Sequence, residues 1–366
     1  MGCPGRSTFR LIPRSGNRRL PSKLQNAPSV PVSRQRLARA FSTNQPSPPG
    51  RRPNFVLSSG ASGTTIHRLT DVQKSLPVAE RPRRPEWMKV RAPSADSRYF
   101  DVQKLIHGQN LHTICEEARC PNIAECWGRG TATFQILGET CTRACRYCYV
   151  HSGKPEHPPD PLEPLRLAHT AAQMGLKHVV VTSVDRDDLP DKGAGHYAAT
   201  IRALKAKVPR ASIEILTPDF LGYEEEALEV VLAERPDVFN HNIETVRRLH
   251  RKMRGAKVDY DKALWLLARA KEVAGYPVMT KSGIIVGLGE TNDEVVETMR
   301  DLRAHGVDVV TIGQYLQPSA KHAKIDRWVH PDEFRWFRGT RPNPVAAQSR
   351  TRRKEGRLGG RPSFVS

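Results

Sequence analysis

The chain has 366 residues and a formal net charge of +20, so it can bury a substantial core. A charge of this size suggests a nucleic-acid partner, but residues 71–338 carry 39 basic and 37 acidic residues, and the excess lies in the two ends. The composition therefore argues against nucleic-acid binding by the central region, and the lack of a bilayer-length apolar run argues against membrane insertion.

The N-terminal end is basic. Residues 1–70 hold 12 Lys or Arg and no acidic residue, which is typical of a mitochondrial presequence. Arg39-Ala-Phe41 before Ser42 resembles a processing site, so we expect a transit peptide over 1–41 and a mature protein in the mitochondrial matrix. A disordered basic arm that binds nucleic acid is the alternative. Residues 42–80 are predicted to be a polar linker.

Residues 81–133 are predicted to form an N-terminal extension that starts with a proline-rich, extended lead-in without packed elements. Six of the seven cysteines lie in this extension or shortly after it, in two groups of three. The first group has four and then five residues between its sulfurs, and the second has three and then two. The groups are Cys115, Cys120 and Cys126, and Cys141, Cys145 and Cys148.

The second group offers three thiolates from one short loop, which suits a single iron–sulfur cube whose fourth iron lacks a cysteine. An open iron can chelate a small molecule. A disulfide framework suits short secreted chains better, and zinc sites usually use paired CxxC or Cys/His ligands. The length of this chain and its expected intracellular location argue against the first alternative, and the wider spacing of the two cysteine groups argues against the second.

From residue 134 to 338, short β-rich apolar runs alternate with helical patterns, which predicts a parallel α/β sheet. The expected strands lie near 134–138, 178–183, 213–217, 238–243, 280–286 and 309–315. The expected helices lie near 164–175, 194–207, 224–234, 260–273 and 292–306.

The second cysteine group directly follows the apolar run Phe134-Gln-Ile-Leu-Gly138, and in this the chain resembles radical S-adenosylmethionine (SAM) enzymes. The first group resembles the auxiliary-cluster motif of the lipoyl synthase family. Further stretches with this resemblance are Pro85–Lys89, Thr182–Pro190, Leu216–Phe220, Phe239–Thr245, Thr280–Gly283, Gly287–Thr291 and Thr311–Pro318.

The resemblance implies a (β/α)6 partial TIM barrel of radical SAM type with an N-terminal cluster-binding extension. It implies two [4Fe–4S] clusters and S-adenosylmethionine as cofactors. The second cysteine group would be catalytic and hold the cluster that cleaves the cofactor, and the first would hold an auxiliary cluster. The cofactor-binding residues implied are Thr182, Ser183, Arg186, Asn240, Asn242, Glu244, Lys281 and Gln314. Arg143 is expected to be a hydrogen-bond or charge partner of the cluster.

The implied reaction is the insertion of two sulfur atoms into an octanoyl chain on a lysine of a lipoyl carrier domain. The carriers would be the glycine cleavage H protein and acyltransferase subunits of 2-oxoacid dehydrogenases. Other implied partners are an electron donor such as ferredoxin and iron–sulfur assembly proteins. Another radical SAM sulfur-inserting enzyme, similar to biotin synthase, is the first alternative. A basic nucleic-acid-binding protein with a structural cluster is the second.

The chain departs from the family at its C-terminal end. The family completes the auxiliary cluster with a serine in an Arg-Ser-Ser-Tyr motif, and this chain has no such motif. Residues 339–366 contain 13 Gly, Pro or Arg and are predicted to be an atypical, disordered basic tail. We assign the serine ligand to no residue. A frameshift or misread exon boundary would explain the departure, and a naturally divergent tail is the alternative.

Overall fold

The computed structural model describes residues 6–10, 84–89, 98–118, 120, 122–128 and 131–340. The predicted linker, the predicted basic tail beyond residue 340, and all of the predicted transit peptide except residues 6–10 lie outside the described residues.

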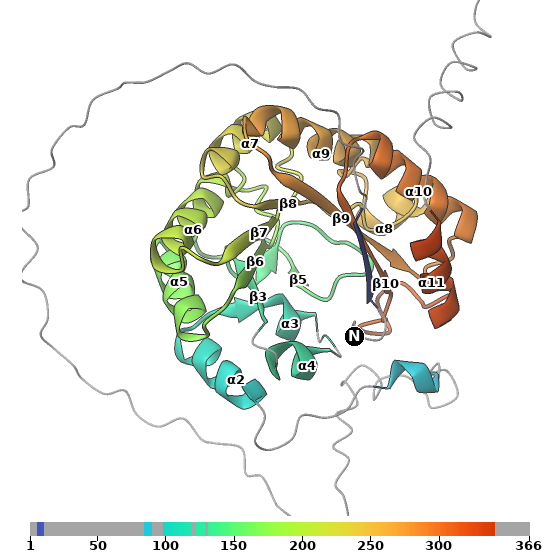
Figure 1. Ribbon diagram of the computed structural model, residues 1–366, viewed down its shortest axis with the longest axis horizontal. Helices are drawn as coiled ribbons and strands as arrows, with labels where there is room; N and C mark the ends of the chain where they lie inside the picture. Colours follow the sequence, from blue (N-terminus) through green and yellow to red (C-terminus); the bar gives the residue numbers. More distant parts are fainter. Residues whose placement is uncertain are drawn as a thin grey trace, which may run out of the picture. The chain divides into compact units, whose positions relative to one another are not determined.

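Six parallel strands form the centre of one curved sheet, and each is hydrogen-bonded to the next one along the chain. Helices cover its outer side (Figure 1). This confirms the (β/α)6 partial barrel. The strands are β3 (Thr133–Ile136), β6 (His178–Ser183), β7 (Ser212–Leu216), β8 (Val238–Asn240), β9 (Met279–Val286) and β10 (Val309–Gln314).

Two antiparallel strands occupy the edges of the sheet. β2 (His112–Thr113) pairs with β3, and β1 (Arg6–Arg10) pairs with β10 so that Arg6 lies opposite Gly313. β1 was not expected from the sequence, because its five residues lie within the predicted transit peptide. The carboxyl ends of the six parallel strands still share one edge, where barrels of this class place their functional loops.

The five predicted helices are confirmed within two residues at each end. They are α5 (Glu163–Gln173), α6 (Ala194–Lys207), α7 (Glu224–Ala233), α9 (Tyr260–Ala274) and α10 (Asn292–Ala304). The sequence did not predict α8 (Arg247–Arg254), where two buried apolar side chains stand among five basic ones, or α11 (Pro331–Gly339). Within the described residues, no helix has the length and apolar character needed to cross a bilayer.

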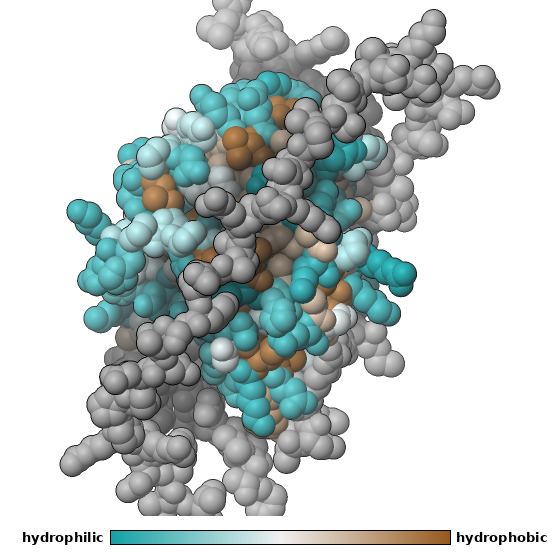
Figure 2. All heavy atoms as spheres, turned by 90° about the vertical axis from the view of Figure 1, so that its left-hand side faces the viewer, coloured by the Kyte–Doolittle hydropathy of each residue, from teal (hydrophilic) through white to brown (hydrophobic). Residues whose placement is uncertain are grey.

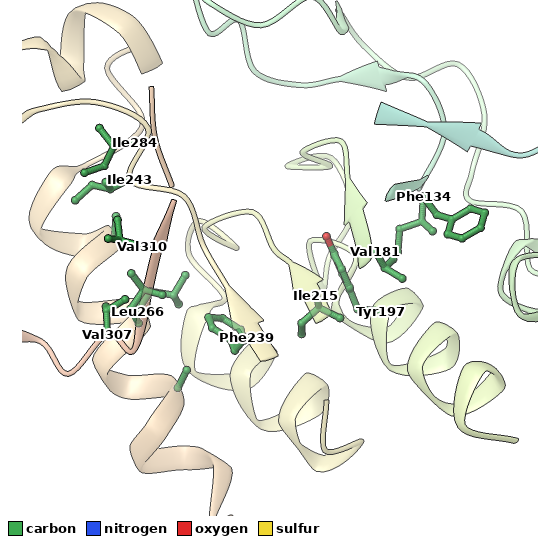
Figure 3. Packing of buried hydrophobic residues seen from close by; sticks show 14 of the residues in the cluster. Phe134, Val181, Tyr197, Ile215, Phe239, Ile243, Leu266, Ile284, Val307 and Val310 are labelled. Carbon is green, nitrogen blue, oxygen red and sulfur yellow. The ribbon is translucent and has the colours of Figure 1, made fainter. Parts of the chain in front are cut away.

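The core lies between the sheet and the helices. Its strand side chains include Phe134, Val181, Ile215 and Phe239, which pack toward the helices in Figure 3 and are fully buried. Burying one such side chain contributes about 1.5–3 kcal/mol. The face seen in Figure 2, on the side of α5 and α6, is mostly hydrophilic with small separate apolar patches. The sheet is therefore fixed by burial, and its strand ends are left to polar residues.

The N-terminal extension packs on the β3 side of the sheet and carries α2 (Arg98–Gly108), α3 (Ile114–Glu117) and α4 (Ile123–Gly128). Tyr99 of α2 stacks on the fully buried Trp127 of α4, with ring centroids 5.1 Å apart. The expectation of no packed element in the lead-in is wrong in one place. Glu86–Met88 forms a 3-10 turn after Pro85, and the ring centroids of Trp87 and His330 lie 5.0 Å apart.

The turn after β9 needs glycine at residue 287. Its φ is +98°, and a Cβ there would lie 2.4 Å from Nε2 of Gln314 and 2.7 Å from the Arg327 carbonyl oxygen. Gly275 also has a positive φ, +63°, but a Cβ there would meet nothing within 4 Å. A side chain at residue 275 would therefore add backbone strain alone, whereas a side chain at residue 287 would add backbone strain and a steric clash.

We expect Gly287→Ala to reduce the free energy of unfolding by about 1–3 kcal/mol more than Gly275→Ala, because only the first adds an overpacked contact to the left-handed strain. Urea denaturation of the two variants would measure the difference. Equal losses would show that the turn after β9 relaxes freely.

Candidate iron–sulfur and cofactor site

The loop that carries Cys141, Cys145 and Cys148 is closed at its base. Strand β4 (Thr140–Cys141) pairs with β5 (His151–Ser152), and the Gly153 N–H donates to the Cys141 carbonyl oxygen at 2.9 Å. A loop closed in this way has fewer conformations than an open one, so its three sulfur atoms are confined to one small region. We call residues 141–152 the cysteine loop.

Backbone amides point at the first sulfur of the cysteine loop. The N–H groups of Arg143 and Asp185 donate to Sγ of Cys141 at 3.5 and 3.3 Å. Hydrogen bonds to sulfur stabilise a thiolate and tune an iron–sulfur cluster. All three cysteines are free and half-buried. The donor set therefore fits a cubane cluster with three cysteine ligands and one open iron.

Without metal, the same thiols hold their protons firmly. Burial raises the pKa of Cys141 and Cys148 to about 12, and the Asp185 carboxylate adds to the effect at Cys141. Burial also raises the pKa of Cys145, against the influence of Arg254. Iron must therefore displace these protons when a cluster is assembled, as metal–thiolate sites generally require.

Arg143 joins the cysteine loop to two neighbouring strand ends. Its guanidinium donates to the Asp187 carboxylate after β6, at 2.8 Å from Nη2, and to the Asp219 carboxylate after β7, at 3.0 Å. Its side chain is only 4% exposed, so these ion pairs replace its hydration. The guanidinium of Arg143 thus links three loops, whereas its backbone N–H is the group that donates to a cysteine sulfur. Charge pairing of Arg143 with a cluster stays a prediction.

Asn242 and Glu244 lie beside the cysteine loop. The Asn242 carbonyl oxygen accepts from Nη1 of Arg254 at 2.8 Å, and the Arg254 carbonyl oxygen lies 3.6 Å from Sγ of Cys145. Glu244 has a φ of +69°, and its N–H donates to the Gly283 carbonyl oxygen at 2.9 Å. Such strain in a non-glycine residue persists where the surroundings impose it, which is common at functional sites.

Gly283 explains how Asn242 reaches this position. A Cβ at residue 283 would lie 2.6 Å from Oδ1 of Asn242, so only glycine leaves room for the amide across β9. Strand β8 ends at Asn240, three residues before the predicted end at 243, so Asn242 lies in the loop that follows the strand.

Asn240 and Lys281 meet at a carboxylate that the sequence analysis missed. Glu214 of β7 is buried and accepts from Nδ2 of Asn240 at 2.9 Å and from Nζ of Lys281 at 2.7 Å. Burial alone would raise the pKa of Glu214, but bonds from His178, Lys281 and Asn240 outweigh it and lower the pKa to about 2. The available signal was an acid at the centre of the apolar run Ser212–Leu216.

The remaining predicted cofactor residues differ in how many hydrogen bonds their side chains already make within the protein. Thr182 donates to the Leu216 carbonyl oxygen at 3.1 Å, and Ser183 is half-buried at the end of β6. Arg186 donates to the Asp188 carboxylate and to the carbonyl oxygens of Leu137 and His157. Nε2 of Gln314 donates to the carbonyl oxygens of Tyr315 and Arg327, and its Oε1 accepts from the Val329 N–H. Arg186 and Gln314 thus tie loops together.

The first cysteine group lies on α3, α4 and the turn between them. The Cys120 N–H donates to the Cys115 carbonyl oxygen, and the Cys126 N–H donates to the Asn122 carbonyl oxygen, both at 2.9 Å. Among the described residues none of the three cysteines forms a disulfide, and all three are half-buried. Nε1 of the adjacent Trp127 is buried without a partner among the described residues, so a hydrogen-bond acceptor from outside them would satisfy it.

Three polar side chains show that the two cysteine-bearing segments lie next to each other. Within the segment of the first group, Nδ1 of His112 on β2 lies 3.6 Å from Oε1 of Glu117 on α3, and this contact raises the pKa of His112. Glu139, two residues before Cys141, completes a group whose nearest ligand atoms all lie within 4.8 Å of one another. The segments that hold the two cysteine groups are therefore neighbours in space.

Comparison with known proteins agrees with this geometry. The profile of the radical SAM superfamily matches residues 136–302. The profile of the N-terminal domain of lipoyl synthase matches residues 54–120, so it begins inside the predicted linker.

Three relatives are named lipoyl synthase. The one from Methylococcus capsulatus is 56% identical over 253 residues, covering 69% of this chain and 77% of the relative. The one from Leptothrix cholodnii is 52% identical over 260 residues, covering 71% and 77%. The one from Burkholderia mallei is 51% identical over 265 residues, covering 72% and 79%. The chain therefore belongs to the lipoyl synthase family of radical SAM enzymes.

Proposed function

We propose that this chain uses two cysteine-held [4Fe–4S] clusters with separate roles to make the lipoyl cofactor. As a lipoyl synthase it is a sulfurtransferase that inserts two sulfur atoms into an octanoyl chain carried on a lysine of a lipoyl carrier domain. The observation that carries the proposal is the pair of neighbouring three-cysteine segments, one of them closed at the mouth of a radical SAM barrel.

The cysteine loop would hold the cluster that binds S-adenosylmethionine. When bound, the cluster and cofactor supply a 5′-deoxyadenosyl radical that abstracts hydrogen from an unactivated carbon. The amides of Arg143 and Asp185 hold Cys141 in place, and Arg254 orients the segment beside Cys145. A fixed arrangement limits side reactions of a radical, because the nearest C–H bond is then the intended one.

The strand ends would receive the cofactor's polar groups. Ser183, Asn242 and Glu244 are half-buried at the ends of β6 and β8, and Oδ1 of Asn240 is buried without a partner among the described residues. Lys281 and Glu214 orient the Asn240 amide from inside the barrel. We propose that Ser183, Asn240, Asn242 and Glu244 contact the cofactor. Thr182, Arg186, Lys281 and Gln314 would position them.

The first cysteine group would hold the auxiliary cluster and donate its sulfur. Cys115, Cys120 and Cys126 supply three ligands, so one iron of a cube needs a further ligand that we assign to no residue. The carriers we propose are the glycine cleavage H protein and the acyltransferase subunits of 2-oxoacid dehydrogenases. Reductant and new clusters would come from a ferredoxin-type donor and iron–sulfur assembly proteins in the mitochondrial matrix.

Cys145→Ala should lower reductive cleavage of S-adenosylmethionine by more than roughly 100-fold, since losing even an outer-shell partner of a metal site costs up to that. Anaerobic assay of 5′-deoxyadenosine measures the loss, and Ala144→Ser in the same loop is the matched control. Undiminished cleavage by the alanine variant would remove the cysteine loop from the mechanism.

Cys120→Ala should leave reductive cleavage of S-adenosylmethionine within about twofold of the parent while abolishing lipoyl product, because only sulfur donation is lost. Mass spectrometry of an octanoylated carrier domain follows the product. If cleavage and sulfur insertion fell together while the cluster of the cysteine loop stayed intact, the two groups would not have separate roles.

Import should be followed by cleavage near Ser42, because an acid-free basic segment is driven inward by the membrane potential. N-terminal sequencing of protein recovered from the matrix checks the site. A matrix protein that begins at Met1, or a cytosolic location for a fusion of residues 1–80, would contradict this expectation.

A further inference from the structure

Five exposed basic side chains come from three segments that meet at the cysteine loop. They are Arg146, Arg251, Lys252, Lys321 and Lys324, which we call the basic rim. Arg146 belongs to the cysteine loop itself, between the second and third cysteines. Arg251 and Lys252 lie on the last turn of α8, and the two lysines lie in the segment that follows β10.

Backbone hydrogen bonds bring the three segments together. The Arg146 N–H donates to the Met253 carbonyl oxygen at 2.8 Å, and the Arg146 carbonyl oxygen accepts from the Ala323 N–H at 2.8 Å. The backbone of Arg146 is therefore hydrogen-bonded to both of the other segments that carry rim residues. The basic side chains form one surface because their backbones are connected, although they are far apart in the sequence.

The charge of the rim is not neutralised by the described residues. No ion pair in that part of the chain includes any of the five side chains. On the same helix, Arg247 pairs with Asp261 and Arg248 pairs with Glu294, each at 2.7 Å. Unpaired cations at a helix C-terminus interact favourably with the helix dipole, which accounts for α8. It does not account for the basic residues on the two loops.

The rim also lies next to Cys145, one of the proposed ligands of the radical cluster. Arg146 directly follows Cys145, and Sγ of Cys145 lies 3.6 Å from the carbonyl oxygen of Arg254 on α8. A redox partner held on the rim would be separated from the cluster ligands by one layer of loop. Transient electron-transfer complexes use small contact areas and depend on charge complementarity for rapid association.

We propose that the basic rim docks a small acidic one-electron carrier protein that reduces the cluster held by the cysteine loop. One electron leaves the reduced carrier and enters the cluster, so the carrier is oxidised by one electron and no atom is transferred. This inference rests on the proposed function. An acyl carrier domain fits the rim less well, because its substrate must reach both cysteine groups and no rim residue belongs to the segment with the first group.

The test uses the assembled holoenzyme and an acidic plant-type [2Fe–2S] ferredoxin as the probe. The rim variant is Lys252→Glu with Lys324→Glu. The control is Lys205→Glu with Lys207→Glu, which makes the same charge change on exposed residues in the last turn of α6. Calorimetry measures Kd for the oxidised probe at low salt, stopped flow measures cluster reduction by the reduced probe, and dithionite-driven cleavage measures the catalytic machinery.

We expect the rim variant to bind ferredoxin at least about tenfold more weakly and to be reduced correspondingly more slowly, because electrostatic steering contributes factors of about 10 to 1,000. Dithionite-driven cleavage should stay unchanged, and the control should match the parent. Equal ferredoxin binding by both variants would overturn the proposal. So would a rim variant that loses binding to a lipoyl carrier domain or to DNA but keeps ferredoxin. Failure of dithionite-driven cleavage in the parent would contradict the function instead, and the binding measurement would still decide the role of the rim.

Discussion

Closure of the cysteine loop is the constraint on which the rest of the site depends. Three sulfur atoms separated by three and two residues can ligate one cube only if the backbone between them holds a single shape. The pairing of β4 with β5 fixes the base of the loop, and Arg143 fixes its side through Asp187 and Asp219. Because those carboxylates follow β6 and β7, the loop takes its position from the barrel.

The charged side chains around the cysteine loop are also held in place by the rest of the chain. Arg254 supplies positive charge near the sulfur of Cys145, and Asp185 and Glu244 supply negative charge near the sulfur atoms. The charge of Arg143 acts on Asp185. Burial raises the pKa of Asp185, and the nearby arginines offset this effect only in part. Both arginines are held by carbonyl or carboxylate partners. The surroundings of the cluster are therefore preorganised by the chain before any cofactor binds.

Much of the fold could be predicted because apolar periodicity marks elements that are buried on one or both sides. The six strands and five main helices follow that signal. α8 did not, because its buried Leu249 and Met253 stand among five basic residues. Two of these, Arg247 and Arg248, pair with carboxylates from other segments. β1 did not either, since pairing with β10 is a long-range contact that composition alone cannot specify.

The residues of the site also fall into those that local sequence predicts and those that it does not. Cysteine spacing is local, so both groups could be found from the sequence. The partners of Lys281 and Arg186 are set by three-dimensional neighbours. Lys281 bonds Glu214, and Arg186 bonds the carbonyl oxygens of Leu137 and His157. Glu214 itself was missed because one acid in a strand has no motif around it. Local chemistry is thus visible in the sequence, whereas positioning residues become visible only when the strands lie side by side.

The most direct test of the account is anaerobic counting of iron and sulfide. Assembled protein should contain roughly eight iron atoms and eight sulfides per chain, and removing either complete cysteine group should leave roughly four of each. A chain that never exceeds four iron atoms, or one in which loss of the first group also empties the second, would contradict two independently held clusters.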